Sequence, residues 1–301
     1  MTVIIPPYLK PGDTIAITCP AGYMAAENAA ACIETLKQQG YIVVTGKTLG
    51  SNSQNYFSGT DDERLEELQV FLDDKNIKAI LCGRGGYGTG RIIDRLDFKK
   101  FTAHPKWVIG FSDITVLHSH IYSNYKIAGL HASMASAFKD GNNEFTESLL
   151  AALRGDKAIY QSVTGKNRPG HVKGRLVGGN LALLAHLCGT ASDIKTKNCI
   201  LFLEDIGEYL YNIDRMLYQL KRTGKLKNLG GLIIGGFSDM KDTERPFGKN
   251  IHEILTELVK KYDYPVCFNF PVSHEKENMA LKIGAKYKLE VNEASATLSE
   301  C

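Results

Sequence analysis

The sequence lacks the features that mark disulfide-rich, membrane and nucleic-acid-binding proteins. Its seven cysteines are odd in number and widely spaced, with no C-x-x-C pair, which argues against a disulfide framework and against a metal site. No apolar run approaches the length of a membrane span. The 36 basic residues are nearly balanced by 33 acidic ones, for a net charge of +3. We therefore expect neither nucleic acid nor a membrane surface as a partner.

The pattern of a signal peptide is also missing. The first residues, MTVIIPPYLKPGD, contain no basic segment followed by a long apolar run. Several cysteines lie in apolar surroundings, as in AILCG and YPVCFNF, and buried free thiols are typical of a reducing compartment. We therefore expect a cytoplasmic protein.

Apolar strands alternate with helical patterns through the first half of the chain. The 301 residues are enough for one large domain or two ordinary ones. The pattern predicts strands over 13–19, 41–46 and 77–82, with helices over 25–39 and 61–74 between them. This alternation is typical of an α/β fold in which helices cover both faces of a parallel sheet.

The periodicity fades over residues 149–173, where glycines and a proline interrupt it. We interpret this segment as a linker between an N-terminal α/β domain, 1–148, and a C-terminal domain, 174–301. The C-terminal domain has its own apolar strands, CILFLE and LGGLIIGGF, and its own amphipathic helices, YNIDRMLYQLKRTG and NIHEILTELVKKY.

The most informative segment is KWVIGFSDITVLHSHIYSNY, residues 106–125. A short apolar strand ends at Gly110, and Ser112 follows at the start of an apolar-periodic helix. Strand, sharp turn and helix with a hydroxyl at the turn is the arrangement of a nucleophile elbow, whose helix N-terminus offers N–H groups to an oxyanion. The second glycine of G-x-S-x-G is missing, so helix capping by Ser112 or Asp113 is the alternative interpretation.

A glycine cluster, GRGGYG at 83–88, follows a predicted strand and opens a helix. It matches the dinucleotide-binding pattern G-x-G-x-x-G, but it follows the third predicted strand, and no acidic residue ends a strand about 20 residues later. Because parallel strands end at one edge of their sheet, the cluster is also placed to face the same cleft as Ser112. A nucleotide-binding protein without a serine nucleophile and a simple packing turn both stay open at this point.

A serine nucleophile needs a base, and the base needs a carboxylate that orients it. Two histidines are placed near strand ends: His131 follows KIAGL, and His274 lies in the polar loop NFPVSHEKEN. A surface position without catalytic function is the alternative for His274. Glu204 ends the buried strand CILFLE, which makes it a better orienting group than Asp205 or Glu208, for which capping of the following helix is favoured.

Several segments, in order, resemble one family. RGGYGTGRIIDRLDF, IGFSDITVLH, GLHASM, GRLVGGNL, LFLEDIGEYLYNIDRMLYQL and SHEKENMALKIG resemble the LD-carboxypeptidase family of serine peptidases, which includes muramoyltetrapeptide carboxypeptidases and microcin-C self-immunity peptidases. The match extends from PPYLKPGDTIAITCPAG to KIGAKYKL, nearly the whole chain. The resemblance implies an N-terminal α/β domain similar to class I glutamine amidotransferases, a smaller C-terminal domain with a β-rich core, and a homodimer.

The resemblance also implies a Ser-Glu-His triad in that chain order. Matched motif by motif, its members are Ser112, Glu204 and His274. The chain departs from the family pattern after the histidine, where Glu275 stands at the place of a frequent glycine. From the resemblance we predict a serine carboxypeptidase that needs no cofactor and no metal.

The predicted reaction is hydrolysis of the terminal L,D-peptide bond of a murein tetrapeptide, with release of D-alanine during cell-wall recycling. The N–H of Asp113 and one from Gly85 or Gly86 are the predicted oxyanion hole. Arg84 is predicted to bind the free carboxylate of the substrate, with bracing of the glycine turn as the alternative. A self-immunity peptidase acting on acyl-nucleotide peptides is the alternative function; such members carry a tryptophan in a substrate loop, whereas the only tryptophan here is Trp107.

Overall fold

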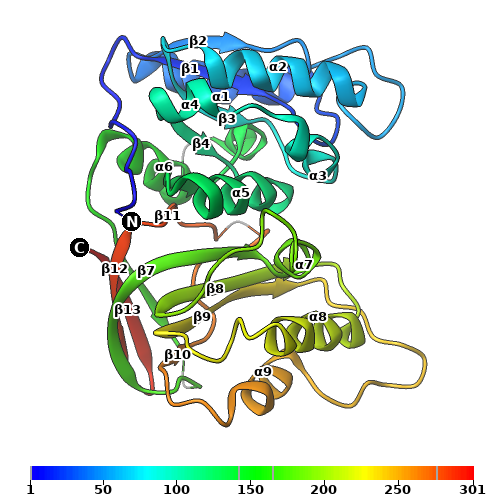
Figure 1. Ribbon diagram of the computed structural model, residues 1–301, viewed down its shortest axis with the longest axis vertical. Coiled ribbons are helices and arrows are strands. Elements are labelled where there is room, and N and C mark those ends of the chain that lie inside the picture. The colour runs from blue at the N-terminus through cyan, green and yellow to red at the C-terminus, as the bar shows by residue number, and fades with distance from the viewer. Residues whose placement is uncertain (1, 142, 165, 276) are drawn as a thin grey trace. The chain divides into compact units, whose positions relative to one another are not determined.

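The computed structural model describes residues 2–141, 143–164, 166–275 and 277–301. They fall into two compact units: unit 1 is Met1–Asp156 with Ala280–Lys282, and unit 2 is Lys157–Met279 with Ile283–Cys301. Each unit contains one β-sheet and the helices that connect its strands (Figure 1). The expected α/β class, with a β-rich second part, is confirmed.

The sheet of unit 1 has the strand order β11-β5-β4-β3-β1-β2, and its neighbours from β5 to β2 are parallel. The strands are β1 (Thr14–Thr18), β2 (Ile42–Thr45), β3 (Ile77–Cys82), β4 (Trp107–Ile109), β5 (Gly129–His131) and β11 (Leu281–Ile283). The central strands β1, β3 and β4 are almost wholly buried, which is why they appear in the sequence as continuous apolar runs. Their carboxyl ends share one edge, where β3 is followed by the glycine cluster and β4 by Ser112.

The helices of unit 1 connect these strands. They are α1 (Ala30–Gln38), α2 (Asp61–Asp73), α3 (Thr89–Ile92), α4 (Lys99–Ala103), α5 (Thr115–Tyr125) and α6 (Glu144–Arg154), with 3-10 turns at Ala26–Ala29, Ile93–Arg95, Ser112–Ile114 and Ala135–Asp140. Helix α2 begins with a capping box: the Glu63 N–H donates to the Thr60 hydroxyl, and the Thr60 N–H donates to the Glu63 carboxylate. Two N–H groups without helical partners are satisfied in this way, which fixes where the helix starts.

Unit 2 is built on a mixed sheet with the order β10-β9-β8-β7-β12-β13-β6. Its strands are β6 (Ile159–Val163), β7 (Gly170–Asn180), β8 (Cys199–Ile206), β9 (Gly231–Ser238), β10 (Val266–Cys267), β12 (Lys286–Val291) and β13 (Ser295–Glu300), and its helices are α7 (Leu181–His186), α8 (Leu210–Arg222) and α9 (Ile251–Val259). Strands β7 to β10 run parallel, while β12, β13 and β6 complete the sheet with antiparallel pairs. The parallel part brings the carboxyl ends of β7, β8 and β9 to one edge.

The observed units differ from the expected division at 149–173. This segment holds the end of α6, the strand β6 and the start of β7, and β6 pairs with β13 at the edge of the second sheet. Ile159 and Val163 of β6 are 68% and 84% exposed. An edge strand that buries so little has weak periodicity, so its sequence is indistinguishable from a connection. Residues 280–282, expected in the C-terminal domain, belong instead to unit 1.

Most of the cysteines are packing residues. All seven are free thiols and five of them are buried. Burial raises the pKa of Cys19 and of Cys32 to about 12, so both stay protonated and unreactive at neutral pH. Within the described ranges, no helix is both long and apolar enough to cross a membrane. The same residues contain no cluster of three or more His, Cys, Asp or Glu side chains arranged to hold a metal ion.

Candidate active site

Ser112 lies at a strained turn in unit 1. Its φ is +61°, in the left-handed region that residues other than glycine and asparagine seldom adopt. Gly110 directly follows β4, and Ser112 is the first residue of the 3-10 turn that leads into α5. A buried strand, a strained serine and a helix start follow one another directly, which is the backbone geometry of a nucleophile elbow.

Gly85 of the glycine cluster lies against this elbow. A Cβ added to Gly85 would be 2.8 Å from the Cβ of Ser112, 3.1 Å from its Oγ and 3.5 Å from the backbone nitrogen of Asp113. A Cβ added to Gly86 would instead meet the hydroxyl of Tyr56 at 2.9 Å. The structure therefore brings Gly85, Ser112 and Asp113 together, whereas a side chain at Gly86 would point toward Tyr56.

Arg84 braces the glycine cluster from outside. Its exposed guanidinium donates through Nη1 to the Tyr23 carbonyl at 3.0 Å. The Gly22 N–H donates to the Gly85 carbonyl at 3.2 Å and connects the same two loops. This is the bracing role that the sequence left as the alternative to carboxylate binding. A guanidinium has five N–H donors, so the observed bond is compatible with both roles.

In unit 2, Glu204 and His274 form a hydrogen-bonded pair. The Nδ1 of His274 lies 2.5 Å from Oε2 of Glu204; Glu204 is fully buried, and the His274 side chain is 12% exposed. Burial lowers the pKa of His274, but the hydrogen bond and charge of Glu204, with the charge of Asp205, outweigh it and raise the pKa overall. A histidine held through Nδ1 by a carboxylate exchanges protons through Nε2, which is the arrangement of a general base with its orienting acid.

Two adjacent glycines on β9, Gly235 and Gly236, allow the loop that carries His274 to approach Glu204. A Cβ added to Gly235 would lie 2.2 Å from the Val272 carbonyl oxygen and 3.3 Å from the Cβ of Glu204, and one added to Gly236 would lie 2.4 Å from the Cβ of Ser273. The Gly236 N–H donates to the Val272 carbonyl at 2.9 Å. Glycine inside a strand is a known signal of close backbone approach. The doublet in LIIGGF carried that signal, and the sequence interpretation missed it.

Asp205 does not cap the helix that follows it, and that expectation was wrong. Its carboxylate accepts hydrogen bonds from Nδ2 of Asn180 at 2.8 Å and from the N–H of Ala182 at 3.0 Å, so it caps α7 rather than α8. Burial raises its pKa to about 6. Glu208 accepts from Nδ2 of Asn212 in the first turn of α8. The bond between Asn180 and Asp205 crosses neighbouring strand ends, and sequence spacing does not reveal it.

His131, the other histidine placed near a strand end, is a core residue. It is fully buried in β5, and its ring centroid lies 5.8 Å from that of Phe111, the residue before Ser112. Packing beneath the elbow is the role that these surroundings support.

Both units match models of the same protein family. Residues 15–132 match the model of the LD-carboxypeptidase N-terminal domain, and residues 173–289 match that of the LD-carboxypeptidase C-terminal domain. The chain belongs to the LD-carboxypeptidase family. This confirms the resemblance found in the sequence, and with the names of its relatives it identifies the chain as a carboxypeptidase of a serine peptidase family.

Relatives of this LD-carboxypeptidase match it over nearly their full length. A probable murein peptide carboxypeptidase of Bacillus subtilis is 34% identical over 299 residues, covering 97% of this chain and 93% of the relative. The murein tetrapeptide carboxypeptidase of Pseudomonas aeruginosa is 31% identical over 290 residues, covering 92% and 93%. The microcin C7 self-immunity protein MccF of Escherichia coli is 25% identical over 334 residues, covering 97% and 94%.

A solved structure confirms the fold. The crystal structure of the muramoyltetrapeptide carboxypeptidase from Oxalobacter formigenes matches with a TM-score of 0.85 at 29% identity, covering 95% of this chain and 98% of that one. The two-domain architecture of the LD-carboxypeptidases is therefore that of this chain.

Proposed function

We propose that this LD-carboxypeptidase releases the terminal D-alanine of a murein tetrapeptide, with Ser112, Glu204 and His274 as its catalytic triad. The observation that carries the proposal is the buried Glu204–His274 pair. A carboxylate bound to Nδ1 of a histidine forms two of the three members of a catalytic triad, and the packing of a core does not require such a pair. The strained elbow at Ser112 supports the other half. The relatives named for murein peptides are 34% and 31% identical, against 25% for the self-immunity protein.

The proposed chemistry assigns one task to each side chain. Oγ of Ser112 attacks the scissile carbonyl, and Nε2 of His274 takes its proton and passes it to the nitrogen of the leaving D-alanine. Glu204 keeps the imidazole in the required orientation and stabilises its cation. A water molecule, deprotonated by His274, then hydrolyses the acyl-enzyme and regenerates Ser112.

The negative charge that develops on the carbonyl oxygen needs donors beside the serine. We assign this role to the N–H groups of Asp113 and Gly85, because both residues lie against Ser112, with the N–H of Gly86 as the alternative to that of Gly85. A carboxypeptidase must also bind the free carboxylate of its substrate. Arg84, with a planar fork of donors at the same strand edge, is the proposed receptor.

The setting of the enzyme is part of the proposal. Free thiols in the core suit a reducing compartment, and a cytoplasmic enzyme would encounter murein peptides that the cell recovers during wall recycling. The family resemblance further favours a homodimer.

The test is a comparison of substrates. The purified enzyme is given a murein tetrapeptide, the same peptide with an amidated terminal D-alanine, and an acyl-sulfamoyl nucleotide, and release of each product is followed by chromatography. We expect D-alanine release from the free acid to be at least about a hundredfold more efficient than cleavage of the nucleotide compound. The reverse preference would make the chain a self-immunity peptidase. Calorimetric titration with NAD is the companion experiment, because micromolar binding would favour a nucleotide-binding function for the glycine cluster.

A further inference from the structure

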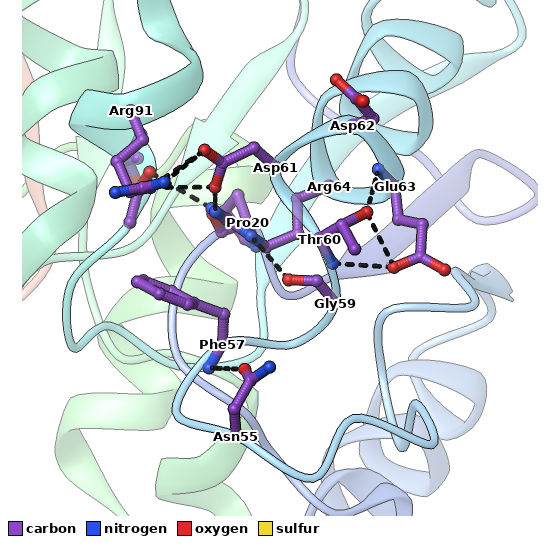
Figure 2. A network of polar contacts seen from close by, with 12 residues as sticks. Pro20, Asn55, Phe57, Gly59, Thr60, Asp61, Asp62, Glu63, Arg64 and Arg91 are labelled. Carbon is purple, nitrogen blue, oxygen red and sulfur yellow. Dashed lines mark hydrogen bonds and ion pairs between the residues drawn. The ribbon is translucent and has the colours of Figure 1, made fainter.

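Arg64, on helix α2, is a fully buried arginine of unit 1 that the proposed mechanism does not use. Its Nη1 donates to the Pro20 carbonyl at 2.5 Å, its Nε donates to the Gly59 carbonyl at 3.4 Å, and its Nη2 pairs with Asp61 (Figure 2). Nη1 also donates to the Gly88 carbonyl at 3.2 Å. One side chain thus joins the loop after β1, the segment before α2 and the end of the glycine cluster. Burying a guanidinium costs several kcal/mol unless its donors are paired, and here four of the five N–H donors have partners.

The bond to Gly88 leads directly toward the elbow. The Gly88 carbonyl and the Thr89 N–H belong to the same peptide group, and that N–H donates to Oδ2 of Asp113 at 2.8 Å. Arg64 therefore holds the oxygen end of this peptide group, and the buried carboxylate of Asp113 holds its N–H end. Charged partners at both ends polarise the peptide and strengthen both bonds. Asp113 is the residue after Ser112, so the series of contacts ends at the nucleophile.

The surroundings of Arg64 fix its position. A Cβ added to Gly88 would lie 2.8 Å from Nη1 of Arg64, so the close contact requires glycine there. The Phe57 ring lies under the guanidinium carbons of Arg64 and Arg91, at 4.9 and 5.4 Å from its centroid, and Arg91 makes a two-pronged ion pair with Asp61 (Figure 2). An arginine enclosed in this way does not reach a substrate. Any effect on the reaction must pass through the groups that it holds.

We propose that Arg64 is a positioning residue for the nucleophile elbow, acting through the Gly88–Thr89 peptide group and Asp113. The inference rests on the proposed role of Ser112. With the guanidinium in place, the glycine cluster and the elbow keep a fixed spacing, and with it the position of Oγ relative to the N–H groups of Asp113 and Gly85. A misplacement of about 1 Å in such a site can lower the rate a hundredfold.

The test replaces Arg64 by lysine, which keeps the charge but lacks the planar fork. We expect Arg64→Lys to lower kcat by roughly ten- to a hundredfold with KM changed less than about twofold. Labelling of Ser112 by a small fluorophosphonate, which needs the nucleophile but little of the substrate site, should slow by a similar factor. Arg95→Lys is the matched control, because Arg95 makes an exposed ion pair with Asp62, and it should leave both rates unchanged. A folded Arg64→Lys enzyme with unchanged kcat and labelling overturns the inference.

A double-mutant cycle with Asp113→Asn separates positioning from general stability. If both side chains act through one peptide group, Arg64→Lys should add little to the loss of kcat already caused by Asp113→Asn. Independent, additive losses overturn the inference. If Arg64→Lys does not fold, Asp61→Asn is the second variant, because it removes the charge that pairs with the same guanidinium from its partly exposed side. We expect Asp61→Asn to lower kcat about threefold. An unchanged kcat in this variant overturns the inference.

The wild-type enzyme distinguishes this inference from the proposed substrate. Labelling of Ser112 without D-alanine release refutes the murein substrate, and the Arg64 variants can still be compared by their labelling rates. Absence of labelling in the wild type, with D-alanine release intact in Ser112→Ala, refutes the role of Ser112 and this inference with it, and leaves the murein substrate in place.

Discussion

The two units hold their catalytic candidates by different means. In unit 1 the backbone positions Ser112: its φ is +61°, and Gly85 approaches so closely that an added Cβ would meet it. In unit 2 a side-chain hydrogen bond joins Glu204 and His274, which lie 70 positions apart in the chain. A backbone-built site depends on residues that are neighbours in sequence, whereas a side-chain pair depends on the tertiary fold. The two halves should therefore fail differently when they are mutated.

The largest expected effect is the loss of the serine. Ser112→Ala should lower kcat/KM by about four orders of magnitude or more, because members of a triad act as a unit, while the thermal midpoint stays close to that of the wild type. D-alanine release and a thermal melt measure the two quantities. Ser53→Ala, in an exposed loop, is the control and should be fully active. Activity of a few per cent in Ser112→Ala would remove the serine from the mechanism.

Glu204→Gln should have the next largest effect, roughly a thousandfold in kcat/KM, since the amide no longer orients or stabilises the imidazolium. It should also move the acidic limb of the pH profile. In the proposed mechanism the base is neutral His274, so the rate rises as pH passes through its pKa, and Glu204 raises that pKa. Without the carboxylate charge the midpoint should move to lower pH, although the maximum falls. A midpoint that stays or moves upward would place another group in control of this limb.

The raised pKa of His274 also makes its contribution to the free energy of unfolding depend on pH. Because its pKa is raised in the folded state, this contribution is present below the ordinary pKa of histidine and is lost as pH rises through the raised value. Urea unfolding of wild type and Glu204→Gln on both sides of this window measures the difference. The variant should lose this pH dependence, and an unchanged profile would mean that the pair adds nothing to stability.

Two glycine substitutions sharpen the contrast between the units. Gly85 has no left-handed φ, so Gly85→Ala should fold nearly normally yet lose activity by roughly a hundredfold through displacement of Ser112. Gly235→Ala forces a Cβ against the Val272 carbonyl and should cost about 1–3 kcal/mol of unfolding free energy. Urea unfolding and kcat/KM are measured for both. Equal stability losses would mean that the two halves are built alike.

The smallest expected effect concerns Arg84. Arg84→Lys should lower kcat/KM roughly tenfold, because lysine lacks the planar fork that matches a carboxylate. Amidation of the terminal D-alanine should harm the wild type strongly and the variant much less. If both enzymes lose the same factor on amidation, Arg84 only braces the Tyr23 carbonyl, and backbone N–H groups of the glycine cluster become the better receptors.

The same contrast explains what the sequence could predict. The parallel strands β1, β3 and β4 of unit 1 are buried on both faces and alternate with helices, so they follow directly from the apolar pattern. Strand β2 lies at the edge of the sheet and is mostly exposed, and its short apolar run predicted it nevertheless. The elbow and the glycine cluster are local motifs and were found for that reason. The short antiparallel strands β12 and β13 bury alternate side chains over only six residues each, and they were not assigned from the pattern.

Contacts distant in sequence mark the limit of this reasoning. The pairing of Glu204 with His274 came from family resemblance, because nothing in the spacing of the two residues requires it. The bonds of Asp205 to Asn180 and of Arg64 to Gly88 were missed, since each joins segments that only the folded chain brings together. A buried polar residue has a hydrogen-bond partner in most proteins, but the sequence does not show which residue that partner is.

Strand β11 gives the chain a particular order of assembly. It supplies the edge strand next to β5, yet it is made only after nearly all of unit 2. As the polypeptide leaves the ribosome, strands β1 to β5 are synthesised first. Until β11 follows, the outer edge of β5 has no partner strand, and an unpaired strand edge can pair with other chains. The last segment of unit 1, Ala280–Lys282, thus lies between two segments of unit 2 in the chain. A nascent chain released before residue 280 could not close its first sheet and would be a substrate for chaperones or for aggregation.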